Sequence, residues 1–157
     1  MTGLEIALLA DHPEAVDVLA GWFAREWGVG DTRAFEDRRR QLPLRARRDS
    51  LPICLLGLVD GEPVATATLK FREIEYADDA DFWLGSVYVR EDARGRGYGR
   101  AIVAAATDLA VARGFVPLYL YTRDKRELYE HLGWRFVDAT VADARPAIVM
   151  VTPAGAP

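Results

Sequence analysis

The sequence contains one cysteine and two histidines in 157 residues: Cys54, His12 and His131. A single thiol excludes a disulfide framework, and three such residues are too few for a clustered zinc site, so we expect no metal. No apolar stretch reaches the roughly 20 residues of a membrane-spanning helix, and the first residues lack the basic segment of a secretory signal. We therefore expect a soluble, cytoplasmic protein that does not bind a membrane.

An excess of positive charge is also lacking. Lys and Arg number 20 and Asp and Glu number 24, which gives a net charge of −4. This balance argues against a surface built for nucleic acid. Two charged clusters stand out, and each is usually a solvated face. The basic cluster comprises Arg33, Arg38, Arg39, Arg40, Arg45, Arg47 and Arg48, and the acidic cluster comprises Glu73, Glu75, Asp78, Asp79 and Asp81.

Either cluster would influence which ligand binds if it bordered a binding cleft. The acidic cluster would attract a cationic amine, whereas the basic cluster would admit an acidic ligand or a nucleic acid. The sequence leaves both alternatives open.

Hydrophobic periodicity predicts one mixed α/β domain over residues 1–152, followed by a flexible tail at 153–157. The pair Asp60-Gly61 between two apolar runs predicts a hairpin, and Pro43 interrupts the second helix. Asp124 is expected to cap the last, short helix. Strands are predicted at residues 4–9, 53–59, 64–71, 82–89, 116–121, 135–139 and 147–151, and helices begin near residues 13, 32, 98 and 124.

Three alternating glycines separate the fourth apolar run from a helix, in the stretch Arg94-Gly95-Arg96-Gly97-Tyr98-Gly99. Their spacing matches neither a Walker loop nor a dinucleotide fingerprint. A glycine-rich helix start with Arg94, Arg96 and Arg100 beside it offers backbone N–H groups and positive charge, which suit a pyrophosphate. The alternative is a tight turn with solvated arginines.

The stretch from Arg94 to Gly99 resembles the Q/R-x-x-G-x-G/A loop of the GNAT superfamily of acetyl-CoA-dependent N-acetyltransferases. The stretch 128–134, LYEHLGW, resembles the later helix of that family, usually L-Y-x-x-L-G-F. The two motifs follow in the family's order, and the specific similarity runs from about Phe82 to Phe136.

This resemblance implies a mostly antiparallel sheet of about seven strands, flanked by about four helices, whose fourth and fifth strands splay apart around acetyl-CoA. The pyrophosphate would bind Arg94, Gly95, Arg96, Gly97, Tyr98, Gly99 and Arg100. The backbone of Val87, Tyr88 and Val89 would pair with the pantetheine arm, and one N–H there would polarise the thioester carbonyl.

Tyr129 is the candidate catalytic residue. Attack of an amine on acetyl-CoA expels a thiolate whose conjugate acid has a pKa of about 8.5, and a tyrosine with a pKa of about 10 holds a proton to donate. A tyrosine at this helix position has that role in the similar family. The alternative is a purely packed core aromatic.

The general base is not identified by the sequence. Trp83 stands where relatives carry a carboxylate, and Thr122 stands where they often carry an asparagine. Asp81 shares the strand face of Trp83 and is one candidate base, with a water chain as the other. Cys54 lies in an apolar strand and is expected to be buried and inert, which argues against an acetyl-cysteine intermediate.

The sequence thus predicts an acyltransferase that moves an acetyl group from acetyl-CoA to a primary amine of a small molecule or peptide in a ternary complex. A catalytically weak acyl-CoA-binding or regulatory module is the alternative, because position 83 lacks the carboxylate. The identity of the acceptor, longer acyl groups and a homodimer are left open.

Overall fold

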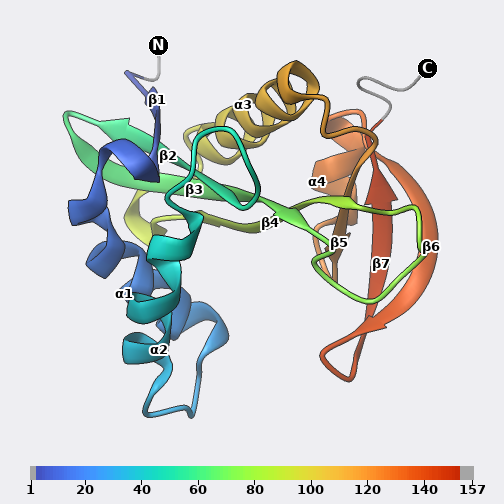
Figure 1. Ribbon diagram of the computed structural model, residues 1–157, viewed down its shortest axis with the longest axis horizontal. Helices are drawn as coiled ribbons and strands as arrows, with labels where there is room; N and C mark the ends of the chain where they lie inside the picture. Colours follow the sequence, from blue (N-terminus) through green and yellow to red (C-terminus); the bar gives the residue numbers. More distant parts are fainter. Residues whose placement is uncertain (1–2, 153–157) are drawn as a thin grey trace. The chain divides into compact units, whose positions relative to one another are not determined.

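The computed structural model describes residues 3–152, so the predicted tail at 153–157 lies outside the described residues. Seven strands form one sheet in the order β1-β2-β3-β4-β5-β7-β6 (Figure 1). β4 pairs with β5 in parallel, whereas β1 with β2, β5 with β7 and β6 with β7 are antiparallel. The predicted mixed, mostly antiparallel sheet is confirmed.

The elements follow the predicted order. The strands are β1 Glu5–Leu8, β2 Ile53–Val59, β3 Glu62–Phe71, β4 Phe82–Val89, β5 Leu118–Thr122, β6 Arg135–Ala142 and β7 Arg145–Val151. The α-helices are α1 Val16–Trp27, α2 Ala34–Gln41, α3 Tyr98–Arg113 and α4 Arg126–His131. Single 3-10 turns are η1 Leu9–Asp11, η2 Pro13–Ala15, η3 Leu42–Arg45 and η4 Glu91–Ala93.

The chain divides into two compact units. The first unit comprises Met1–Thr68 and Ser86–Ala106, and the second comprises Leu69–Gly85 and Thr107–Pro157. β3, β4 and α3 each contribute residues to both units. The prediction of one domain over residues 1–152 stays a prediction, and each unit is described by itself below.

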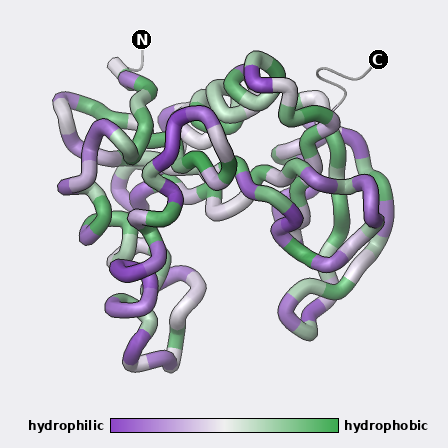
Figure 2. Tube along the Cα trace, viewed as in Figure 1, coloured by the Kyte–Doolittle hydropathy of each residue, from purple (hydrophilic) through white to green (hydrophobic). Residues whose placement is uncertain are grey.

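The core of the first unit forms where α1 packs on the sheet. Leu19 and Phe23 lie one helical turn apart, so they share a face, and both are fully buried. They belong to a cluster that includes Leu56 of β2 and Tyr88 of β4. Figure 2 shows β2 and β3 mainly in the hydrophobic colour and α2 mainly in the hydrophilic colour.

Turn chemistry sets two boundaries in this unit. Asp60 and Gly61 have φ of 50° and 80°, the left-handed pair that a two-residue hairpin requires, which confirms the predicted turn. Pro43 falls inside η3, directly after α2, so the predicted interruption of the second helix is also confirmed.

The core of the second unit is built around Trp83 of β4. Its side chain is fully buried, its Nε1 donates to the Ala80 carbonyl at 2.7 Å, and its ring lies 5.5 Å from that of Tyr119 on β5. Val149 of β7 completes the cluster.

Two expectations about the second unit are wrong in detail. α4 has Lys125 rather than Asp124 at its N-cap position, and the Lys125 N–H donates to the Thr122 hydroxyl at 3.1 Å. β6 and β7 are longer than predicted, because Asp143 and Ala144 adopt φ of 51° and 61° and make a hairpin turn without glycine.

Candidate functional site

The glycine loop, residues 94–100, runs from η4 into the first turn of α3. Gly95 and Gly97 have φ of 79° and 86°, which side-chain-bearing residues rarely adopt. A Cβ added at either glycine would meet no atom within 4 Å, so the backbone conformation, not internal packing, requires glycine here. The first turn of a helix leaves several N–H groups without an intrahelical partner. The loop therefore presents an open backbone surface that can accept an anion.

The arginines of the loop divide into two kinds. Arg94 is held by the protein, because its Nε donates to the Val89 carbonyl at 3.0 Å and its guanidinium lies 5.3 Å from the centre of the Tyr88 ring. Arg96 and Arg100 are exposed and form no ion pair within residues 3–152. Their charges are thus available for a phosphate, whereas Arg94 anchors the loop to β4.

A shallow recess of about 280 Å³ lies beside the loop. Arg90, Arg96 and Tyr98 contribute to its wall, together with Asp60 and Glu62 from the hairpin between β2 and β3. The wall carries both basic and acidic side chains, so the recess by itself is not suited to an anion alone.

The end of β4 lies directly against the glycine loop. A Cβ added at Gly99 would lie 3.4 Å from Cγ2 of Val89. Val87 and Val89 are half-buried, and the Tyr88 ring is buried, where it stacks on Trp22 at 5.3 Å. The first unit therefore brings together all the predicted cofactor-binding residues, with Tyr88 contributing a core side chain as well as backbone.

Ser86 interrupts the regular geometry of β4. Its φ of 50° is unusual for a serine in a strand and changes the direction of the backbone before Val87. The residue pairs that join β4 to β5 are Phe82 with Leu118 and Trp83 with Tyr119, at the start of both strands.

Arg45, which the sequence placed only in the basic cluster, contacts this strand. Its Nη1 donates to the Ser86 hydroxyl at 3.1 Å and to the Thr68 hydroxyl at 3.2 Å. Its guanidinium lies 5.7 Å from the centre of the Phe23 ring. Neither its neighbours in sequence nor its spacing gave a signal for this contact, since hydroxyl partners on distant strands leave no local pattern.

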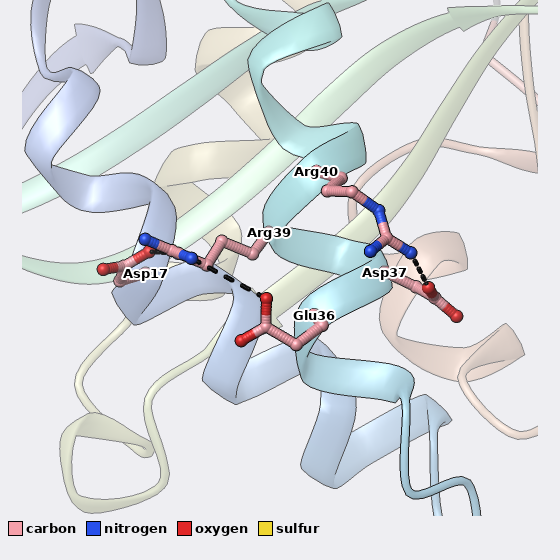
Figure 3. Close-up of polar contacts among 5 residues, drawn as sticks. All are labelled: Asp17, Glu36, Asp37, Arg39 and Arg40. Atoms are coloured by element: carbon pink, nitrogen blue, oxygen red, sulfur yellow. Dashed lines mark hydrogen bonds and ion pairs between the residues drawn. The ribbon is translucent and has the colours of Figure 1, made fainter.

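Other arginines of the basic cluster are paired with nearby carboxylates. Arg39 contacts Asp17 of α1 at 2.9 Å and Glu36 at 3.7 Å, and Arg40 pairs with Asp37 (Figure 3). Arg48 likewise pairs with Asp11. The pairs of Arg39 and Arg40 reduce the net positive field of α2 and weigh against a nucleic-acid surface there.

Tyr129 lies in the second unit, on α4. Its side chain is 7% exposed, and its ring meets that of Trp134 edge to face at 5.9 Å. Burial, with a smaller contribution from Asp124, raises the pKa of the Tyr129 phenol to about 12. The phenol therefore stays protonated throughout the physiological range.

The Tyr129 hydroxyl makes no hydrogen bond within the described residues, although the backbone around it is well tied. The Tyr129 N–H donates to the Lys125 carbonyl, and the Tyr129 carbonyl accepts from the N–H groups of Leu132 and Trp134. The ring of Tyr129 packs in the core, and its hydroxyl has no hydrogen-bond partner among the described residues. Packing and proton donation by this side chain are therefore compatible.

The candidate base Asp81 is engaged elsewhere. Its Oδ1 accepts from Arg72 Nε at 3.0 Å and lies 2.8 Å from Arg72 Nη2, and the Asp81 carbonyl accepts from the Arg72 N–H. The fully buried Trp83 has no acid–base group. Cys54 is fully buried beside Thr66, which confirms its predicted burial.

Two further observations concern metal sites and membrane-spanning helices. Residues 3–152 contain no cluster of three His, Cys, Asp or Glu side chains that would hold a metal ion. No helix in this part of the chain is long and apolar enough to cross a membrane.

Comparison with known proteins gives a consistent result. Mouse N-alpha-acetyltransferase 80 is 33% identical over 91 residues, which are 55% of this chain and 29% of that protein. An aminoglycoside 6'-N-acetyltransferase solved in complex with coenzyme A superposes with a TM-score of 0.72 at 17% identity, over 94% of this chain and 96% of that chain. An acetyltransferase of the GNAT family from Streptococcus pneumoniae gives 0.68 at 16% identity, over 95% and 99%.

The two structural similarities bear on the fold, and they agree with the sheet order and the parallel β4–β5 pair described above. Residues 16–134 match the acetyltransferase (GNAT) family, and this range contains β4, the glycine loop and Tyr129. On that match, which spans most of the sequence, the chain belongs to the GNAT family of acetyltransferases.

Proposed function

We propose that the protein transfers an acetyl group from acetyl-CoA to a primary amine by direct attack in a ternary complex. The observation that carries the proposal is the glycine loop. Its two left-handed glycines, open on the outer side, stand at the start of α3 beside the unpaired Arg96 and Arg100. This is the arrangement expected of a pyrophosphate site.

The first unit would bind the cofactor mainly through its backbone. The pyrophosphate would accept hydrogen bonds from the backbone N–H groups of residues 95–100. The pantetheine arm would pair with the main chain of Val87, Tyr88 and Val89. Arg94 fixes the loop to the Val89 carbonyl, so these two binding elements are held as one piece. One N–H of this strand segment would stabilise the oxygen that becomes negative in the tetrahedral intermediate.

The chemistry requires two proton movements. The acceptor ammonium must lose a proton before its nitrogen attacks the acetyl carbonyl, and the departing thiolate must gain one. We assign the second role to Tyr129, whose hydroxyl is protonated and uncommitted. Because a pKa of about 12 makes this phenol a weak acid, full transfer is favourable only to a thiolate that is itself desolvated.

The activities of the similar proteins support a nitrogen acceptor. The mouse relative is an N-alpha-acetyltransferase, and the structural neighbour is an aminoglycoside 6'-N-acetyltransferase. Each name states transfer to nitrogen. For this chain we propose a primary amine on a small molecule or a peptide.

An amine panel tests the proposal. The protein is incubated with acetyl-CoA and, in turn, aminoglycosides, polyamines, free amino acids and peptides with free N-termini, while released CoA thiol is followed. At least one amine should release CoA well above the rate without an acceptor and should gain one acetyl group by mass spectrometry. If acetyl-CoA binds and no amine is acetylated, the result rejects the proposed acetylation of an amine and supports the alternative, a catalytically weak acyl-CoA-binding or regulatory module.

A further inference from the structure

Among the five carboxylates of the acidic cluster, Glu73 differs from the others by its burial. Its side chain is 12% exposed, whereas Glu75, Asp78 and Asp79 are exposed and Asp81 is paired with Arg72. A charged side chain is rarely placed inside a protein unless it is paired or functional.

The pairing of Glu73 is incomplete. Its Oε1 accepts from Lys70 Nζ at 2.9 Å, but Oε2 is covered from solvent and has no hydrogen-bond partner among the described residues. A buried acceptor without a partner is uncommon in native structures and calls for an explanation.

Glu73 lies against β4 within the second unit. A Cβ added at Gly85 of β4 would overlap the Glu73 carboxylate and lie 2.8 Å from its Cδ. Gly85 does not have a positive φ, so its backbone conformation does not require glycine. Glycine is needed here because a side chain would occupy the space of the Glu73 carboxylate. Gly85 follows Trp83 by two residues and therefore lies on the same strand face.

The charge of Glu73 also acts on Tyr121 of β5. Burial is the main cause that raises the pKa of the Tyr121 phenol, and the negative charge of Glu73 is the next, with Asp143 after it and Arg123 in opposition. Among the described residues, Lys70 from β3 is thus paired with this carboxylate, and Tyr121 from β5 is close enough to be affected by its charge.

We propose that Glu73 is the proton acceptor for the acceptor ammonium. In this step the N–H bond of R–NH₃⁺ breaks, its electron pair stays on nitrogen, and the proton forms an O–H bond at Glu73, leaving R–NH₂ and a neutral carboxylic acid. The free amine then attacks the acetyl carbonyl. Relatives carry a carboxylate at the position of Trp83. In this chain Glu73, in the segment between β3 and β4, would provide that carboxylate instead. This inference rests on the proposed acetylation of an amine.

The test compares Glu73→Gln with Glu75→Gln, an exposed residue of the same segment, using the amine that the wild-type protein acetylates fastest. kcat/KM is measured from about pH 6 to about pH 10, a range that approaches the pKa near 10.4 of an alkylammonium group. Glu73→Gln should lose roughly 10²- to 10⁴-fold near pH 7, and the loss should shrink at high pH as free amine forms without a base. Glu75→Gln should follow the wild type.

A purely structural role for Glu73 predicts a different pattern, with a loss that is constant across pH or accompanied by weaker acetyl-CoA binding. Either pattern, or turnover within a few-fold of the wild type at every pH, overturns the proposal. Gly85→Ala provides a second variant, because its methyl group displaces the carboxylate without removing it and should reproduce the pH-dependent loss. Absence of turnover by the wild type with every amine would instead overturn the proposed function on which this inference rests.

Discussion

The two units of the chain offer different kinds of chemistry. In the first unit, the candidate site is made of main chain: two glycines held at positive φ, the first turn of α3 and the last residues of β4. In the second unit, the candidate groups are two side chains, the buried Tyr129 and the largely covered Glu73. We infer that cofactor binding depends on backbone conformation and proton transfer on individual functional groups, so substitutions in the two units should separate affinity from rate.

The largest effect is expected from Tyr129→Phe. Removal of the hydroxyl keeps the ring and its contact with Trp134, so stability should change little. The turnover number kcat should fall roughly 10²- to 10⁴-fold, while the acetyl-CoA dissociation constant changes little. Single-turnover kinetics with an identified acceptor is the measurement, because slow product release would mask the loss. Turnover within a few-fold of the wild type would mean that the thiolate takes its proton from water.

The second effect should be on affinity alone. Gly97→Val places a branched side chain at a φ of 86° and covers the backbone that a phosphate would approach. We expect the acetyl-CoA dissociation constant to rise about 100-fold, which equals about 2.7 kcal/mol. Strain of roughly 1–2 kcal/mol should leave the protein folded.

Gly30→Val is the matched control for this substitution. Gly30 also has a positive φ, 82°, and open space at its Cβ, but it lies between α1 and α2. This variant should share the strain and keep the affinity. A folded Gly97→Val protein with an unchanged dissociation constant would show that the glycine loop is only a turn.

A third prediction concerns ionisation of Tyr129. The folded-state pKa of about 12 lies above the ordinary value of 10.0. Below pH 10 the phenol is protonated in both the folded and the unfolded protein, so its ionisation costs no stability there; between about pH 10 and pH 12 the unfolded state releases the proton first and stability falls. Alkaline difference absorbance should therefore find one tyrosinate titrating near pH 12 that is missing in Tyr129→Phe. If the titration component that disappears in Tyr129→Phe lies near pH 10 instead, burial does not raise the pKa of this phenol.

The smallest effect is expected from the exposed arginines of the loop. Arg96→Gln removes one solvated charge and should weaken acetyl-CoA binding only about 2- to 5-fold, with the difference fading at high salt. Arg94→Gln should weaken binding and also lower the unfolding temperature, because it removes the contacts with Val89 and Tyr88. Equal thermal stability of the two variants would argue against an anchoring role for Arg94.

How far the sequence predicted the structure depended on whether a feature is local. The hairpin at Asp60-Gly61 and the glycine loop were predictable, because their residues have conformational requirements that neighbours do not alter. The turn at Asp143 and Ala144 was missed, because neither residue is glycine and the pairing of β6 with β7 imposes their positive φ.

The candidate site shows the same limit. Tyr129 was predicted from a contiguous motif, which lies within the residues 16–134 that match the family, and its role stays a prediction. Glu73 stood in the sequence as one of five clustered acids, and only the fold distinguishes it, since its burial and its contact with Gly85 arise between residues 12 positions apart. Asp81 was the candidate by strand alternation, but its pairing with Arg72 could not be anticipated from spacing.

The central claim is that the first unit binds acetyl-CoA on the glycine loop and β4, and thermal unfolding with added cofactor tests it most directly. Acetyl-CoA at about 100 times its dissociation constant should add about 2.7 kcal/mol to the free energy of unfolding. NAD and ATP at the same concentration should add much less. Gly97→Val, whose dissociation constant is expected to rise about 100-fold, should keep only about 0.4 kcal/mol of the effect, whereas Gly30→Val keeps all of it. An unfolding temperature that neither acetyl-CoA nor CoA changes would contradict the claim.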